Sequence, residues 1–375
     1  MNLSVYGGAF YGDAPDETHP WCIHDDNRPQ PRVVTPDKNQ ISLSPPSDAI
    51  SLFNGKNFSQ WANLKPDLKT PAWEVKEGEL ICVPHNGSIR SQEEFGDCQL
   101  HLEWAAPREN DNVGQNRGNS GIFIMGICEI QILDNYHNQT YADGTAGAYY
   151  GVVPPLVNAL RPSGEFQFVD IIFRRPIYKN NQLLDSGSIT VLINGVLVQD
   201  HVMIEGPTGH RSRVKATPFP EKGPLVLQDH HHKVRFRNIW YRPLPPRAIE
   251  GGTDGPISAE ATTAKRKEIA AVIRKDSEIL EDSSNPLPQL IRVMESLVYE
   301  KNDEAYQKTV RLADQYVATV SKLTGEELTT QKEEIIRIKN SFEYCAKFKV
   351  IPADFPPLRT LLKIYNDQGW NNPKK

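Results

Sequence analysis

The spacing of apolar residues changes abruptly along this chain, and that change determines how the chain is organised. Up to about residue 244 apolar side chains alternate with polar ones in short runs, whereas after residue 260 they recur about every 3.6 residues. Between the two regions, residues 243–256 are rich in proline and glycine and favour neither helix nor strand. We therefore predict two domains joined by a linker at residues 245–260.

The first region has the pattern of short antiparallel strands. No helical period interrupts it, which argues against parallel β-α-β architecture, and Asn-Gly turns occur at 54–55, 86–87 and 194–195. We predict a mostly β fold, an antiparallel β-sandwich (jelly roll) over residues 47–244. The β-branched or aromatic runs with a period of two are 99–104, 121–125, 128–133, 169–173, 189–193 and 233–237.

The two ends of the chain differ from this region. Residues 261–375 are predicted to form a small α-helical bundle, and they contain no histidine, so we do not expect the chemistry there. Residues 1–46 are rich in proline, which indicates a strap laid over the sandwich with Trp21 as its anchor; alternatively, His24 or Asp25 lies at the rim of a site. The predicted helices cover 262–280, 287–299, 303–323 and 326–348.

Composition excludes several classes of function. A net charge of −5 and a pI near 6.1 give no reason to expect nucleic acid or an anionic membrane as partner. No run of about 18 apolar residues is present, so no membrane-spanning helix is expected. The first residues lack the features of a signal peptide, which predicts a cytoplasmic protein as written, or a periplasmic one if a leader has been removed. The five cysteines form no C-x-x-C pair and are expected to be reduced and buried.

Polar residues within the predicted strands are the candidates for chemistry. Glu129 and Gln131 are two residues apart and therefore share a face, with Asp134 following where the strand ends. Glu165 and Gln167 likewise share one face of a predicted strand that leads into Asp170, and Gln228 and His230 share one orientation. A histidine pKa near neutrality suits His230 for acid or base catalysis. Such polar stripes are also common on solvated faces without function.

Two loops add binding candidates. Asn119 lies between glycines just before a strand, where its amide can donate to and accept from hydroxyl groups; a simple turn is the alternative. Tyr150 lies in an aromatic loop rich in glycine and proline and offers a ring face to a sugar. Three consecutive histidines, 230–232, cannot all face one metal from a regular strand, so they are a weak metal signal.

These motifs, taken in order, resemble the 3-keto-disaccharide hydrolase domain family, also described as 3-keto-glucoside 1,2-lyase/3-keto-2-hydroxy-glucal hydratase. The resemblance covers about residues 48–244 and does not reach the helical region. The matching segments are 51–56 with Trp61, 73–76, 95–97, 117–123, 129–134, 147–151, 158–159, 162–167, 192–195, 226–230 and 234–239.

The resemblance implies a concanavalin-like jelly roll whose concave face holds the site, and a glycoside already oxidised at C3 as substrate. A C3 ketone acidifies the C2 proton, so a base can remove it and the enolate expels the C1 oxygen; water then adds back. The implied catalytic residues are Glu129, His230 and Glu165. The implied substrate-binding residues are Asn119, Gln131, Tyr150, Asn158, Gln228, Arg90 and Asp134. The resemblance implies no certain cofactor; the Glu129 and Asp134 carboxylates leave room for a divalent cation such as calcium, and the sequence leaves the metal requirement open.

Two alternatives stay open at this point. Jelly rolls also serve as carbohydrate-binding, lectin-like modules without catalysis, and fold alone does not decide between these functions. A module that only binds needs no convergent Glu129, Glu165 and His230, which favours the enzyme. The helical bundle is compatible with a homo-oligomer or with docking of a partner oxidoreductase that supplies the keto sugar.

Overall fold

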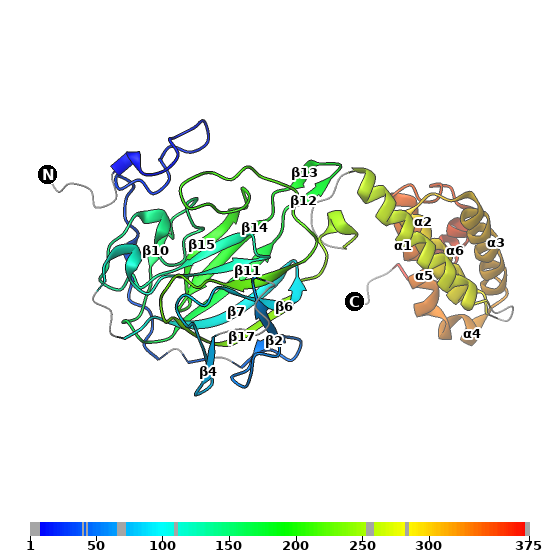
Figure 1. Cartoon of the computed structure of the whole chain (residues 1–375). Coiled ribbons are helices and arrows are strands. Elements are labelled where there is room, and N and C mark those ends of the chain that lie inside the picture. The colour runs from blue at the N-terminus through cyan, green and yellow to red at the C-terminus, as the bar shows by residue number, and fades with distance from the viewer. Residues whose placement is uncertain are drawn as a thin grey trace. The chain divides into compact units, whose positions relative to one another are not determined.

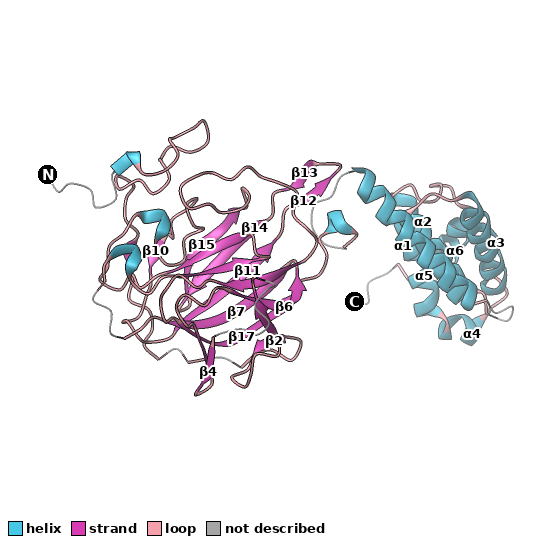
Figure 2. Cartoon of the chain, in the orientation of Figure 1, coloured by secondary structure: helices cyan, strands magenta, loops and turns pink. Residues whose placement is uncertain are grey.

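The computed structural model describes residues 8–39, 41–42, 44–65, 73–108, 112–252, 259–281 and 285–371. The chain divides into two compact units, Met1–Pro245 and Pro246–Lys375. The first contains the strands and the second the long helices (Figures 1 and 2). Residues 1–7 of the predicted strap and 253–258 of the predicted linker lie outside the described residues. Among the described residues, no helix has the length and apolar character that crossing a membrane requires.

An eight-stranded antiparallel sheet forms one layer of the first unit. Its order is β15-β14-β11-β7-β17-β5-β4, with β2 also paired to β17. The strands are β2 (Ile50–Phe53), β4 (Glu74–Lys76), β5 (Glu79–Ile81), β7 (Cys98–Ala105), β11 (Gln167–Arg174), β14 (Ser188–Ile193), β15 (Val196–Met203) and β17 (Arg235–Pro243).

A five-stranded antiparallel sheet forms the other layer and carries Arg90, Glu129 and Gln131 of the predicted site. Its order is β3-β6-β16-β8-β9. The strands are β3 (Trp61–Asn63), β6 (Ile89–Phe95), β8 (Ser120–Ile124), β9 (Cys128–Ile132) and β16 (Gly223–Leu227). Two small ribbons complete the unit: β1 (Arg32–Val33) with β10 (Val157–Asn158), and β12 (Ile177–Lys179) with β13 (Gln182–Asp185).

The two sheets share one hydrophobic core. Alternation along each strand sends every second side chain inward, and one cluster joins Leu102 and Ile171 of the larger sheet to Ile89, Ile122 and Ile130 of the smaller one. The predicted β-sandwich followed by a helical bundle is confirmed. All five cysteines are free and buried, as expected.

The N-terminal segment is tied to the sandwich, but not mainly through Trp21. That side chain is only half-buried, whereas the four residues after it, 22–25, are buried. β1 also pairs in parallel with β10, through Arg32 with Val157 and Val33 with Asn158. The predicted strap is therefore anchored by residues 22–25 and by this ribbon.

The second unit is a helical bundle with its own core, which includes Leu290, Val293, Ile338 and Phe342. The helices are α1 (Ala259–Ile279), α2 (Leu287–Tyr299), α3 (Asp303–Val320), α4 (Gly325–Thr330), α5 (Lys332–Lys347) and α6 (Pro356–Asp367).

Two helix predictions were wrong. The helix predicted over 326–348 is broken near Gln331, where Thr329 and Thr330 donate hydrogen bonds back to carbonyls of the preceding turn. Helix α6 was not predicted; it begins with Pro356 and Pro357, because proline lacks an N–H and fits the first turn of a helix, where that N–H would have no partner.

Candidate functional site

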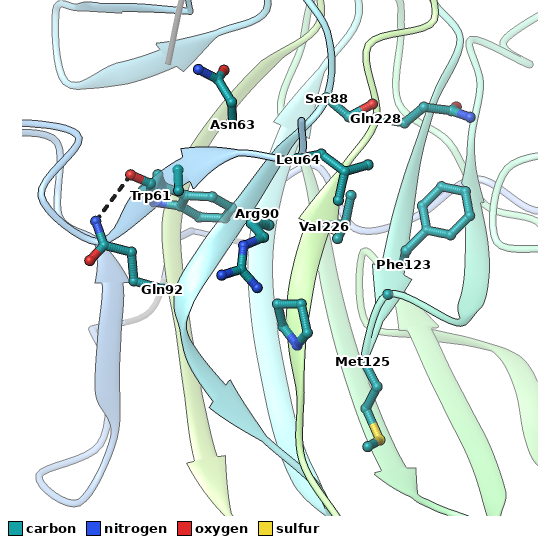
Figure 3. A pocket seen from close by; sticks show the side chains of 13 residues that line it. Trp61, Asn63, Leu64, Ser88, Arg90, Gln92, Phe123, Met125, Val226 and Gln228 are labelled. Carbon is teal, nitrogen blue, oxygen red and sulfur yellow. Dashed lines mark hydrogen bonds between the residues drawn. The ribbon is translucent and has the colours of Figure 1, made fainter. Parts of the chain in front are cut away.

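An open groove of about 880 Å³ lies on the outer face of the five-stranded sheet (Figure 3). Strand register determines its floor, because residues paired across neighbouring strands point to the same face. One row of paired residues crosses the whole sheet: Ala62, Arg90, Val226, Phe123 and Glu129. The first four line the groove, and Glu129 on β9 is the next residue along the row.

The groove combines apolar and polar surfaces, as sugar-binding sites do. Phe123 and Met125 project into it from β8 and the following turn (Figure 3). Gln228, just after β16, also lines it, and its side-chain oxygen is buried without a hydrogen-bond partner among the described residues. A buried carbonyl oxygen of this kind is costly unless a ligand or water pairs with it. The groove therefore offers Gln228 and Arg90 as polar contacts for a bound molecule.

Glu129 is a buried carboxyl group with little to neutralise it. It is 6% exposed, and its carboxylate has no hydrogen bond or ion pair within the described part of the chain. Burial raises the pKa of Glu129 to about 8. Its carboxyl packs over the backbone of Gly121, in the space that a side chain there would occupy. The group is thus placed and tuned for proton transfer near neutral pH.

A cluster of aromatic and histidine side chains lies beside Glu129. The Tyr150 backbone N–H donates to the Glu129 carbonyl at 3.1 Å. The Tyr150 hydroxyl lies 3.0 Å from the Tyr141 hydroxyl and 2.8 Å from Nδ1 of His210. Desolvation lowers the pKa of His210, and the nearby charges of His24, Arg211 and His230 lower it further. His230 itself is exposed in the loop before β17, and desolvation also lowers its pKa.

His24 enters this cluster from the N-terminal segment. Its ring stacks on Tyr141 with centroids 3.9 Å apart, and its Nδ1 lies 3.0 Å from Asp143 Oδ1. The side chain is fully buried, and its Nε2 has no hydrogen-bond partner in the described residues. The backbone at His24 has a φ of 58°, a left-handed conformation that is unfavourable for a residue other than glycine. The contacts with Asp143 and Tyr141 hold it there.

Asn119 and Gln131 lie next to this site, but their amides are used within the protein. Both side-chain NH₂ groups donate to Gln115 Oε1, at 3.1 and 3.0 Å. Asn119 also donates to the Gln115 carbonyl, and Gln131 donates to the Gly144 carbonyl. These residues therefore support the loop after residue 140 that carries Tyr141, Asp143 and Tyr150.

The structure does not bring Glu165 to this site. The strand expected to include Glu165 starts at Gln167 instead, because residues 162–165 form a turn in which the Glu165 N–H donates to the Pro162 carbonyl at 3.1 Å. Glu165 is exposed and lines a separate pocket of about 510 Å³ with Arg161, Arg235 and Arg237. The prediction that Glu165 lies beside Glu129 was therefore wrong.

Asn158 and Asp134 have structural partners. Asn158 donates to the Asn135 carbonyl. Asp134 is 2% exposed, pairs with Arg117 at 2.9 Å and accepts a hydrogen bond from Ser163 at 2.7 Å. Both residues stabilise the loops around the site.

We expect Asp134→Ala to destabilise the β-sandwich unit by roughly 3 kcal/mol, because it leaves the Arg117 guanidinium without its carboxylate. Urea unfolding followed by tryptophan fluorescence measures this loss. The control is Asp48→Ala, which breaks the exposed pair with Arg242 and should leave the unfolding midpoint unchanged. Equal effects of the two substitutions would contradict this assignment.

No group of three or more metal-ligating side chains is found in the described parts of the chain. The Asp134 carboxylate is engaged by Arg117 and Ser163, so it is not a free partner for Glu129. A divalent cation at this site stays an untested prediction.

Comparison with known proteins identifies the family. Residues 48–242 match the model of the 3-keto-alpha-glucoside-1,2-lyase-like domain. The chain belongs to this family. A 3-keto-disaccharide hydrolase of Bacteroides thetaiotaomicron is 23% identical over 253 residues, which is 53% of this chain and 80% of that protein. A crystal structure of a candidate glycosyl hydrolase from Parabacteroides distasonis is 37% identical with a TM-score of 0.52, and the match covers 58% of this chain and 93% of that one.

Membership of the 3-keto-alpha-glucoside-1,2-lyase-like family makes residues 48–242 a carbohydrate-active, hydrolase-like domain. Glu129, Tyr150 and His210 lie within this range, whereas His24 lies before it. Sequence reasoning did not single out Tyr141, Asp143 or His210. The signal in the sequence that pointed to this cluster was the polar segment around His24. His24 was predicted, as one alternative, to lie at the rim of a site, and it is instead fully buried.

Proposed function

We propose that this domain cleaves the glycosidic bond of 3-keto-glycosides by elimination and rehydration. The family match supports the substrate class. The observation that carries the proposal is Glu129, a buried carboxyl group with a pKa of about 8 beside a groove of about 880 Å³. A cavity of this size accommodates a disaccharide.

The chemistry follows from the ketone. The Glu129 carboxylate takes the C2 proton, which the adjacent carbonyl acidifies, and the electron pair moves to the C3 oxygen as an enolate. The enolate re-forms the ketone and expels the C1 oxygen, leaving a C1–C2 double bond. Water then adds its oxygen at C1, and C2 recovers a proton. A base with a pKa near the working pH is the most efficient catalyst for such a step.

The carboxylates around the groove favour this route over ordinary glycoside hydrolysis. Ordinary glycosidases use two carboxyl groups that both reach the sugar. Asp143 is fully buried and bound by His24, Asp134 is paired with Arg117, and Glu165 lies in another pocket. Of these four carboxyl groups, only Glu129 is left beside the groove without a partner of its own in the described part of the chain, and elimination from a keto sugar needs only one carboxyl group.

Donors in the groove suit the developing negative charge. The Gln228 side-chain amide and the Arg90 guanidinium both line the groove, with Gln228 next to β8 and Arg90 farther along the row on β6. Fixed donors stabilise an enolate oxygen most when water is excluded. Release of the aglycone with and without chelator separates their contribution from that of a divalent cation.

We expect kcat/KM on a 3-keto-glucoside to rise with pH and to level off near pH 8. Glu129 must be ionised to act, and its pKa of about 8 means that each unit below this value lowers the active fraction about tenfold. Initial rates of aglycone release between pH 6 and 9, corrected for the uncatalysed reaction, provide the test. A flat profile would contradict the role of Glu129.

The unoxidised parent glucoside is the control substrate, and it should not be cleaved at any pH. Binding of the keto-glycoside without aglycone release would favour a lectin-like module and overturn the proposed function.

A further inference from the structure

We propose that the Tyr150 hydroxyl protonates the departing aglycone oxygen, supported by a chain of hydrogen bonds through Tyr141 and His210. The inference rests on the proposed elimination reaction and adds the acid that this reaction requires. Neither the family match nor the names of the relatives assign this role.

Tyr150 lies close to the proposed base, Glu129. C1 and C2 of the sugar are adjacent atoms, so the acid at C1 must lie beside the base at C2. Tyr150 is joined to Glu129 by a backbone hydrogen bond of 3.1 Å. Of the two tyrosines, Tyr150 is the more exposed, at 7% against 1% for Tyr141.

The hydrogen bonds of the Tyr150 hydroxyl suit an acid that gives up its proton. Its hydroxyl lies between the Tyr141 hydroxyl at 3.0 Å and His210 Nδ1 at 2.8 Å. Both neighbours can donate to the tyrosinate oxygen once the proton has left, His210 in the tautomer with hydrogen on Nδ1. His210 is exposed, so it connects the chain to solvent.

The protonation states of Tyr150 and Glu129 also fit an acid and a base that act together. The base must be ionised and the acid protonated at the same pH. Desolvation raises the pKa of Tyr150, and the charges of Glu129 and Asp143 raise it further, so Tyr150 stays protonated when Glu129 is ionised. His230, which the sequence suggested as a general acid or base, has a lowered pKa and is neutral under those conditions. Tyr150 is therefore the better partner for Glu129.

The cycle balances without an external proton. Glu129 receives the C2 proton, and the aglycone oxygen leaves with the C1–O electron pair and takes the proton of Tyr150. In the second half, water adds its oxygen to C1 and gives a proton to the tyrosinate, while Glu129 returns a proton to C2. Both side chains end the cycle in their starting states.

The N-terminal segment holds the hydrogen-bond chain of Tyr141, Tyr150 and His210 in position. His24 stacks on Tyr141 and is held by Asp143, while the backbone of Asp13 and the carbonyl of Tyr11 bind Arg211, next to His210. His24 is a positioning residue in this scheme, since it is fully buried.

The test compares two 3-keto-glucosides whose aglycones differ in basicity. A 4-nitrophenolate leaves without protonation, whereas a sugar alkoxide needs an acid. We expect Tyr150→Phe to lower kcat/KM on the 3-keto-disaccharide by about 10²–10⁴-fold, and on the nitrophenyl substrate by less than about tenfold. Equal losses on both substrates, or no loss on either, would overturn the assignment.

Tyr149→Phe is the matched control. It removes the neighbouring buried hydroxyl, which donates to the Gly206 carbonyl and is not part of the hydrogen-bond chain through Tyr141, Tyr150 and His210. The substitution should therefore not change the preference between the two substrates. The wild-type protein gives an independent reading. Acid assistance predicts that kcat/KM depends only weakly on aglycone pKa across a series of aryl 3-keto-glucosides, and a steep dependence would refute it. Wild-type protein that cleaves none of these substrates would refute the proposed function itself.

Discussion

Glu129→Gln should lower turnover of a 3-keto-glucoside by about 10²–10⁴-fold, the range typical of losing a general base. The amide has nearly the same shape as the carboxyl group but cannot accept the C2 proton. The expected pH dependence below about 8 should disappear with it, since Glu129 is the group assigned to that transition. Initial rates and a pH profile of the purified variant measure both effects.

The same substitution should not harm folding. The pKa of Glu129 is about 8 in the folded state against an ordinary 4.5, so the folded state holds a proton that the unfolded state releases between these values. Its contribution to the free energy of unfolding therefore falls as pH rises from 4.5 to 8, and the glutamine variant lacks this loss. The control is Glu165→Gln, which lies in the other pocket and should keep near-normal turnover. Near-normal turnover in Glu129→Gln would remove the assignment.

Gly121→Ala should reduce turnover by about 10²-fold although it replaces no catalytic group, the order expected for a misplacement of about 1 Å. Gly121 lies opposite Gln131 in the β8–β9 pairing, and a methyl group there would overlap the Glu129 carboxyl and approach the Phe123 ring to 2.9 Å. The carboxyl must move away from the groove. Rates on the 3-keto-glucoside, with a melting curve to check the fold, measure the effect.

A double variant shows whether Gly121→Ala acts through Glu129. If it does, Gly121→Ala/Glu129→Gln should be no slower than Glu129→Gln alone, because the group being displaced has already lost its function. Losses that multiply in the double variant would mean that the alanine acts elsewhere in the groove.

Sequence reasoning predicted the features that depend on local periodicity. Alternation placed Glu129 and Gln131 on one face of a strand, and β9 has this arrangement. It did not predict that Gln131 and Asn119 would both bind Gln115, because that contact depends on how a long loop folds back over the sheet.

The aromatic cluster was beyond sequence reasoning for the same reason. The contact between His24 and Asp143 joins residues 119 positions apart, and that between Tyr150 and His210 joins residues 60 apart. No spacing rule connects such residues. Only the assembled sandwich, with the N-terminal segment packed against it, brings them to Glu129.

The measurement that tests the central claim most directly is the hydration of the proposed intermediate, 3-keto-2-hydroxy-glucal, in D₂O, with the C2 position of the resulting 3-keto-glucose followed by NMR. In this half-reaction the hydrogen that Glu129 gives to C2 must come from solvent, so we predict enzyme-dependent formation of 3-keto-glucose with deuterium at C2. Incubations without enzyme, and of free 3-keto-glucose with enzyme, correct for spontaneous hydration and exchange. Hydration no faster with the enzyme than without it would contradict the account.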